Sequence, residues 1–436
     1  MFERWREEWK KLRGWRWKAD RPYRLIVFAL MPLAIVAILE PLFAAPDMKW
    51  LRDWVGTSKI FGPIFFPEGE VDWNDRLQFV LGLLALPVLF CLWYWRDRNS
   101  RDQIENARKD INLKEFQEVQ LRAAGALDEK LPAKAREQLQ IAALHQLRGF
   151  LRGEYGDAFR RPAFELLLAG HASAVDAIGV NAIRDYLDQQ NSNPETIYEK
   201  VAEAIAVIRN KLDPVMRVRI GIICDEYQTI FRSGYPLNGR DFSLIKLPEN
   251  SDLTNLELFN CKFIGATLNF VNFENSDLRF TQFMGADLSF ARMNFFSILT
   301  CAFLEGVDLS AAKLANARLF DSNFRGGKLI AADMREASLS DTNFEAANLQ
   351  QSKLGGSDLA NAKLAGANIS GAELWRADLS NIDLYSIQNC EYCIIDQFTQ
   401  FEEGWDYASE EQRKVERQRW IARGAEFAPA NKYLGQ

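Results

Sequence analysis

The sequence predicts a solenoid of stacked square coils, because a large apolar residue returns at every fifth position from Ser251 to about Leu384. A small residue often stands two positions before the large one. A period of five matches neither an α-helix, with 3.6 residues per turn, nor a strand, with a period of 2. It fits a chain that turns a corner every five residues and closes one coil in about twenty, so that each coil covers the apolar face of the next.

Residues twenty apart are expected to lie one above another in such a stack. Five phenylalanines meet this condition if the repeat slips by one residue after Phe303. The predicted core column consists of Phe263, Phe283, Phe303, Phe324 and Phe344. Burying one aromatic ring per coil in this way would stabilise five successive coils.

The stretches GADLSFARM and AANLQQSKLGGSDLANAKLAGANISGAELWRADL resemble the pentapeptide-repeat family, whose repeat reads A(D/N)LXX. The resemblance implies a right-handed quadrilateral β-helix, which we place at residues 241–400. Residues 401–436 are expected to form a C-terminal cap and helix, because the last coil of a solenoid exposes apolar groups and unpaired backbone.

Two apolar stretches, 25–45 and 77–95, approach the ~20 residues that cross a bilayer. Basic residues are concentrated before the first stretch and after the second, whereas the loop 46–76 holds few. The positive-inside rule then predicts a two-pass protein of the bacterial inner (plasma) membrane, with an extracytoplasmic loop and both termini in the cytoplasm. Aromatic and basic residues in 1–24 predict a helix on the inner leaflet or, alternatively, a disordered basic tail. The lipid bilayer is therefore one expected partner.

Residues 96–240 have the periodicity of helices and are predicted to form a helical stalk followed by a helical domain. Pro132 and Pro194 suit the first turn of a helix. The order of segments loosely resembles a helical module that precedes the repeats in bacterial membrane-anchored pentapeptide-repeat proteins. That resemblance implies no chemistry for this region.

The sequence holds little that supports catalysis. It has two histidines, His145 and His171, and neither a Walker loop, a Rossmann glycine pattern nor a nucleophile elbow. Cys390 and Cys393 form a C-x-x-C motif without the two further ligands that a zinc site needs. We therefore expect no enzyme, no cofactor and no metal site.

Several outward positions of the early coils carry phenylalanine, and exposed phenylalanines are normally covered by something. The candidate partner-binding residues are Phe270, Phe280, Phe290 and Phe295. Two interpretations stay open, since either the helical domain of the same chain or a partner protein covers them. The C-terminal helix could also form a homo-oligomer.

The favoured function is a non-enzymatic, membrane-anchored interaction protein, either a scaffold or an accessory subunit of a membrane complex, that binds through a cytoplasmic β-helix. The alternative follows from charge, because residues 241–400 hold 20 acidic and 12 basic side chains. Some members of the family mimic duplex DNA and inhibit topoisomerases, so an acidic rod implies a regulator of that kind. No direct binding of nucleic acid is expected.

Overall fold

The computed structural model describes residues 73–126, 129–180, 183, 196–401 and 409–428. The chain divides into two compact units, residues 1–113 and 114–436. Helix α5, Trp73–Ala123, contains the second predicted membrane stretch. The segments 1–24 and 25–45, and the loop 46–76 up to residue 72, lie outside the described residues.

The predicted two-pass membrane localisation is contradicted. No helix within the described residues is long and apolar enough to cross a bilayer. A crossing helix needs about 20 consecutive apolar residues.

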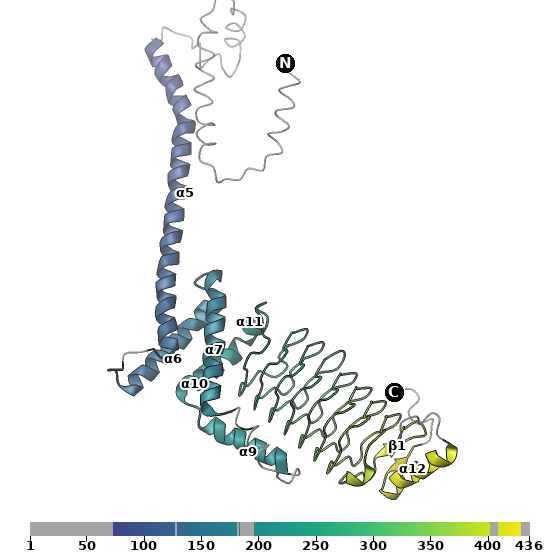
Figure 1. Cartoon of the computed structure of the whole chain (residues 1–436). Helices are drawn as coiled ribbons and strands as arrows, with labels where there is room; N and C mark the ends of the chain where they lie inside the picture. The colour runs from purple at the N-terminus through teal and green to yellow at the C-terminus, as the bar shows by residue number, and fades with distance from the viewer. Residues whose placement is uncertain (1–72, 127–128, 181–182, 184–195, 402–408, 429–436) are drawn as a thin grey trace, which may run out of the picture. The chain divides into compact units, whose positions relative to one another are not determined.

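Short helices precede the coils in the second unit (Figure 1). Helix α10 shows why they begin where they do, because Pro214 occupies its first turn and the Asp213 carboxylate accepts a hydrogen bond from the backbone N–H of Met216 at 2.7 Å. The elements are α6 (Ala133–Arg152), η2 (Asp157–Phe159), α7 (Arg160–Ile178), α9 (Ile197–Asn210), α10 (Pro214–Asp225) and α11 (Tyr227–Phe231).

His171 of α7 joins the helices to the first coil. Its ring is fully buried, and its Nε2 lies 3.0 Å from the carbonyl oxygen of Ser243. Because a carbonyl can only accept, Nε2 carries the proton and donates it. Burial, together with the nearby Arg219 guanidinium, lowers the pKa of His171 to about 4.

We expect His171 to make stability depend on pH. The unfolded chain binds a proton near pH 6.5 and the folded chain only near pH 4, so stability falls as the pH is lowered between these values. The full loss is about 3 kcal/mol by the conversion of pKa shifts to free energy. Urea unfolding at pH 7 and pH 4 measures most of it, with His171→Gln as the control that cannot titrate. An equal pH dependence in both proteins would show that His171 is not responsible.

The stacked coils are joined by parallel β-bridges that run from Asp241 to Gln400. Bridged partners are usually 20 residues apart, as in Asp252 with Asn272, and the backbone N–H of Leu253 donates to the carbonyl oxygen of Asn272 at 2.8 Å. Each side of a coil places a large apolar residue and a small residue inward, and a polar residue between them outward. This alternation is why the five-residue sequence pattern folds into a closed coil around a dry core.

One extra residue changes the register of the coils, and it lies earlier than the sequence predicted. Asp277 bridges Ile298, 21 residues on, so the insertion falls between Met293 and Leu299. The inward residue after Phe283 is therefore Leu304, which is fully buried, whereas Phe303 is only half-buried and occupies the outward position opposite Gln282. The predicted core column is wrong at this residue, because the slip comes before Phe303 and not after it.

The other four phenylalanines of the predicted column are fully buried. Phe263 stacks on Phe283 with ring centroids 5.2 Å apart, and Phe324 stacks on Phe344 at 5.1 Å. Leu304 separates the two stacked pairs. Phe242 of the preceding coil also stacks on Phe263, at 5.3 Å, so the column consists of three stacked rings and a further stacked pair with a leucine between them.

We number the corners of each coil by the turns that follow Leu253, Leu258, Phe263 and Leu268. Helix α9 lies along the third corner, where glycines recur in four successive coils. Its residues Ile205, Val201 and Ile197 sit over these glycines, which are Gly265, Gly285, Gly306 and Gly326. Four helical residues rise ~6 Å and one coil rises ~4.8 Å, so one helical turn advances by nearly one coil. Tyr198 of α9 adds a hydrogen bond to Asp308 at 3.3 Å.

The C-terminal residues close the last coil. They form η4 (Leu384–Ser386), β1 (Ile394–Ile395), α12 (Glu410–Ala422) and β2 (Glu426–Phe427), with β1 and β2 paired in parallel. Ser409 and Gln412 form a capping box at the start of α12. Trp420 packs on Phe401 at 5.6 Å, and Arg423 donates to the carbonyl oxygen of Ile387 at 2.7 Å, so the helix is held over the final coil.

Candidate interaction surface

Phe270 and Phe290 form a stacked pair on the fourth corner. Their ring centroids are 4.7 Å apart and their planes differ by 3°, and the side chains are 37% and 50% exposed. The stacking follows from their spacing of one coil. Helix α9 covers the third corner instead, so the described helices leave this pair open to solvent.

Both residues have left-handed backbone conformations, with φ of 59° at Phe270 and 57° at Phe290. Glycine and asparagine adopt this conformation readily, whereas a bulky residue does so at a cost of about 1–2 kcal/mol. Other coils use the favourable residues at the equivalent turn position, including Asn255, Asn275 and Gly371. Local backbone preference therefore does not explain phenylalanine here.

The inserted residue adds two more exposed phenylalanines, Phe295 and Phe296, at the first corner. Both have left-handed φ, and Phe296 is 73% exposed. Ser297 is the small inward residue after them, because the insertion shifts the register by one. The insertion is the one change of register between Asp252 and Asn368, and the extra residue points to solvent.

Two cations occupy the side of the coil between these corners. Arg292 lies between Phe290 and Phe295 in sequence, and Lys313 is its bridge partner in the next coil. Both side chains are exposed. We call the set Phe270, Phe290, Arg292, Phe295, Phe296 and Lys313 the aromatic–basic face. The sequence signal for it is the insertion itself, which replaces one turn by the run Asn-Phe-Phe.

The fourth candidate, Phe280, lies elsewhere. It occupies the second corner, where it meets Phe259 edge to face with ring centroids 5.4 Å apart, and Arg279 lies 5.7 Å from the Phe259 ring. The structure thus brings Phe270 and Phe290 together at the fourth corner, places Phe295 at the first corner and places Phe280 at the second. Phe259 and Phe296 are exposed aromatic residues that the sequence analysis did not select.

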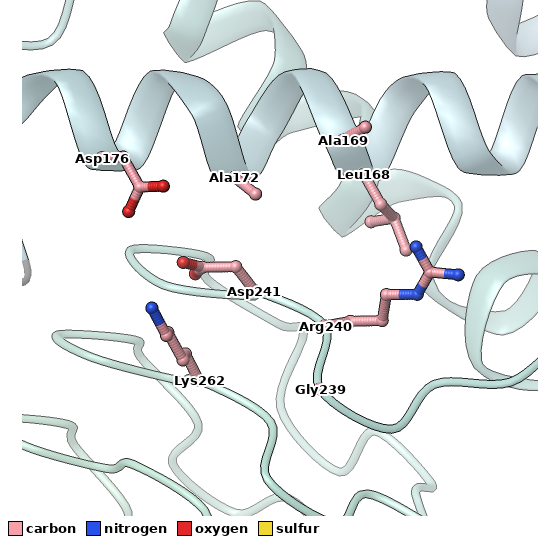
Figure 2. A pocket seen from close by; sticks show the side chains of 8 residues that line it. All are labelled: Leu168, Ala169, Ala172, Asp176, Gly239, Arg240, Asp241 and Lys262. Atoms are coloured by element: carbon pink, nitrogen blue, oxygen red, sulfur yellow. The ribbon is translucent and has the colours of Figure 1, made fainter.

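A small polar cavity lies between α7 and the first coil (Figure 2). Its volume is about 170 Å³, and Asp176, Arg240, Asp241 and Lys262 contribute its charged groups. Asp176, Asp241 and Lys262 point toward one another in the cavity, whereas Arg240 points away from them and pairs with Glu165 at 2.8 Å. Burial raises the pKa of the Asp241 carboxyl. The cavity belongs to the junction between α7 and the first coil, because its lining comes from both.

The C-x-x-C motif is buried beneath the C-terminal cap. Cys390 is 3.4 Å from the carbonyl oxygen of Arg423, and Cys393 accepts the backbone N–H of Glu426 through its own carbonyl at 2.7 Å. In the part of the chain that the structure describes, no group of three histidine, cysteine or carboxylate side chains is placed to hold a metal ion.

Coils of four short parallel strands, joined by tight turns around an apolar core, define a quadrilateral β-helix. Pentapeptide repeats match this region in 8 copies, over residues 250–294, 296–326, 317–356 and 342–381. The repeat region of the chain belongs to the pentapeptide-repeat family, which consists generally of non-enzymatic structural or interaction proteins. No curated protein matches this chain.

Solved structures of repeat proteins resemble parts of the chain. A pentapeptide repeat protein from the cyanobacterium Cyanothece 51142 is 35% identical over 22% of this chain and 64% of its own, with a TM-score of 0.21. HetL of Nostoc sp. strain PCC 7120, involved in heterocyst differentiation regulation, is 22% identical over 42% of this chain and 90% of its own, with a TM-score of 0.21. QnrB1, a plasmid-mediated fluoroquinolone resistance protein, is 21% identical over 42% of this chain and 88% of its own, with a TM-score of 0.22.

Proposed function

We propose that this chain is an interaction protein, a scaffold or accessory subunit, that binds another protein through the exposed phenylalanines at the fourth corner of its early coils, Phe270 and Phe290. The observation that carries the proposal is the stacked pair Phe270 and Phe290, which is exposed and also held in left-handed turns. Exposed aromatic clusters are typical of protein-binding surfaces, since aromatic residues dominate binding energy there.

A structural role for the pair is the competing explanation, and the energetics argue against it. The two rings cover each other only in part and stay 37% and 50% exposed, so stacking adds little stability. Each backbone is in a left-handed conformation that costs about 1–2 kcal/mol for such residues. Asparagine at either position would relieve the backbone. Residues that lower stability in this way are common where function requires them.

The alternative of a DNA mimic has less support. Such a surface needs rows of unpaired carboxylates, and several carboxylates here are neutralised by neighbours on the same coil or the next. Arg279 binds Asp277 through both oxygens, Arg335 pairs with Asp333 at 2.8 Å, and Lys328 pairs with Asp308 at 3.3 Å. The hydrogen bonds from Arg279 lower the pKa of the Asp277 carboxyl. Arg292 and Lys313 interrupt the acidic character further.

The test replaces both phenylalanines by asparagine. Phe270→Asn with Phe290→Asn is expected to keep or slightly raise the thermal midpoint, since asparagine favours the left-handed turn, and to abolish partner binding. The full chain and the variant are purified under the same conditions from cells of the source organism. The proteins that accompany each are then identified by mass spectrometry.

Phe259→Asn with Phe280→Asn is the matched control, because it removes an aromatic pair of similar exposure from the second corner. Loss of the same proteins in the first variant and their retention in the control would support the proposal. Retention in the first variant with an unchanged thermal midpoint would refute it.

A further inference from the structure

We infer that the aromatic–basic face binds an acidic segment of a partner protein, one that carries apolar side chains among its carboxylates. This inference rests on the proposed function and specifies the chemistry of the partner. The inference is drawn from the positive charges of Arg292 and Lys313, on which the proposed function does not depend.

Arg292 and Lys313 are exposed like charges on neighbouring coils. They are bridge partners, so their side chains leave the same side of the coil one strand spacing apart, about 4.8 Å. Among the residues that the structure describes, neither side chain has an ion pair or hydrogen bond. Like charges directly opposite each other destabilise a sheet. An incoming carboxylate would relieve this repulsion.

Three other cations of the coils have acidic partners. Arg279 and Arg335 each bind a carboxylate two residues before them, and Lys328 binds one in the preceding coil. The chain as a whole has a net charge of −6. Arg292 and Lys313 instead face each other on neighbouring coils, and they coincide with the inserted residue and the exposed phenylalanines.

The size of the basic area favours a short acidic segment over an extended polyanion. Along this side of the coils the outward residues are Asp252, Asn272, Arg292, Lys313 and Asp333 in order. The positive charge therefore spans two coils and has an acidic residue beyond it in each direction. A nucleic acid or an anionic bilayer would bring its negative charge against Asp252 and Asp333. A segment of a few residues would not.

The phenylalanines supply apolar contacts on both sides of the cations. Phe290 precedes Arg292 by two residues around the fourth corner, and Phe295 follows it by three at the first corner. A bound segment crossing the coil would meet an aromatic ring, then the two cations, then another aromatic ring. Apolar side chains flanking two carboxylates match this order, and charge complementarity adds specificity to the aromatic contacts.

The test uses the full chain and labelled twelve-residue peptides in which glutamate alternates with leucine and phenylalanine. Matched peptides carry glutamine or lysine in place of glutamate. Fluorescence anisotropy is expected to show the glutamate peptide binding about tenfold or more tightly than the glutamine peptide at low salt, with the difference shrinking as salt screens the charges. Arg292→Glu with Lys313→Glu is expected to reverse the preference toward the lysine peptide.

Arg318→Glu with Lys363→Glu is the control, because it makes the same change of charge at exposed positions on other sides of the coil. Equal binding of the three peptides, absence of binding, or an equal effect of the control would overturn the inference. So would displacement of the glutamate peptide by equimolar oligothymidylate or by phosphatidylglycerol vesicles. If the natural partner is lost in Phe270→Asn with Phe290→Asn but kept after charge reversal, the proposed function stands and this inference fails.

Discussion

Replacing Phe283 by alanine is expected to lower the free energy of unfolding by about 3–5 kcal/mol, as for other buried phenylalanines. The ring is fully buried and stacks on Phe263 at 5.2 Å with planes 9° apart. Its removal leaves a cavity between coils, and the neighbouring coils cannot close it because their spacing is set by backbone hydrogen bonds. Urea unfolding followed by circular dichroism measures the change.

Phe303→Ala is the matched control, because it deletes the same side chain 20 residues further along the chain. If the slip came after Phe303, the two changes would cost the same. In the observed register Phe303 points outward and is half-buried, and Leu304 takes the core position. We expect a cost of about 1 kcal/mol or less for Phe303→Ala, as is usual outside the core. Equal costs for the two variants would contradict the position of the insertion.

Replacing Gly285 by alanine is expected to displace helix α9 from the third corner. The added Cβ would lie 2.5 Å from Cγ1 of Val201, a β-branched side chain with little rotamer freedom. Overpacking of this kind costs about 1–3 kcal/mol, in addition to about 1–2 kcal/mol for a left-handed alanine. Hydrogen exchange of the peptide 197–210 should become faster, and the thermal midpoint should fall.

The same corner provides the control for this change. Gly366 also has a left-handed φ, of 70°, but a Cβ there would meet only backbone atoms of Ala346 at 3.9 Å. Gly366→Ala therefore has the conformational cost without the clash, and Ala346 shows that alanine occurs in this turn. Unchanged exchange of α9 in Gly285→Ala, or faster exchange in both variants, would mean that the glycine corner does not determine where α9 docks.

The coil was predictable from sequence because its period is local. Each group of five residues repeats the same inward and outward positions, so the apolar positions from Leu253 to Leu288 and from Leu309 onward are correct without any knowledge of contacts. The point of the slip was not predictable in the same way. The phenylalanines Phe295, Phe296 and Phe303 each satisfy some register, and only the bridges between coils select one.

The candidate surface could be predicted from the sequence only in part, because some of its features are periodic and others depend on contacts in space. Phe270 and Phe290 were found because a spacing of one coil is visible in the sequence, and stacking follows from it. Phe280 was grouped with them because it is also outward, although its spacing of ten residues from Phe270 places it two corners away. Arg292 and Lys313 were missed because an unpaired charge is recognised by the absence of a partner in space.

By itself, the sequence determined that this chain has a β-helix of pentapeptide repeats, since a five-residue period is encoded in each repeat and needs no distant contact. Only the tertiary structure decided which surfaces remain open. Helix α9 docks on the third corner because four glycines there leave room for Ile197, Val201 and Ile205, and this leaves the fourth corner to solvent. Glycine and phenylalanine occupy equivalent turn positions in the repeat, so the local pattern cannot distinguish a covered corner from an exposed one. Contacts between segments that are sixty or more residues apart make that distinction.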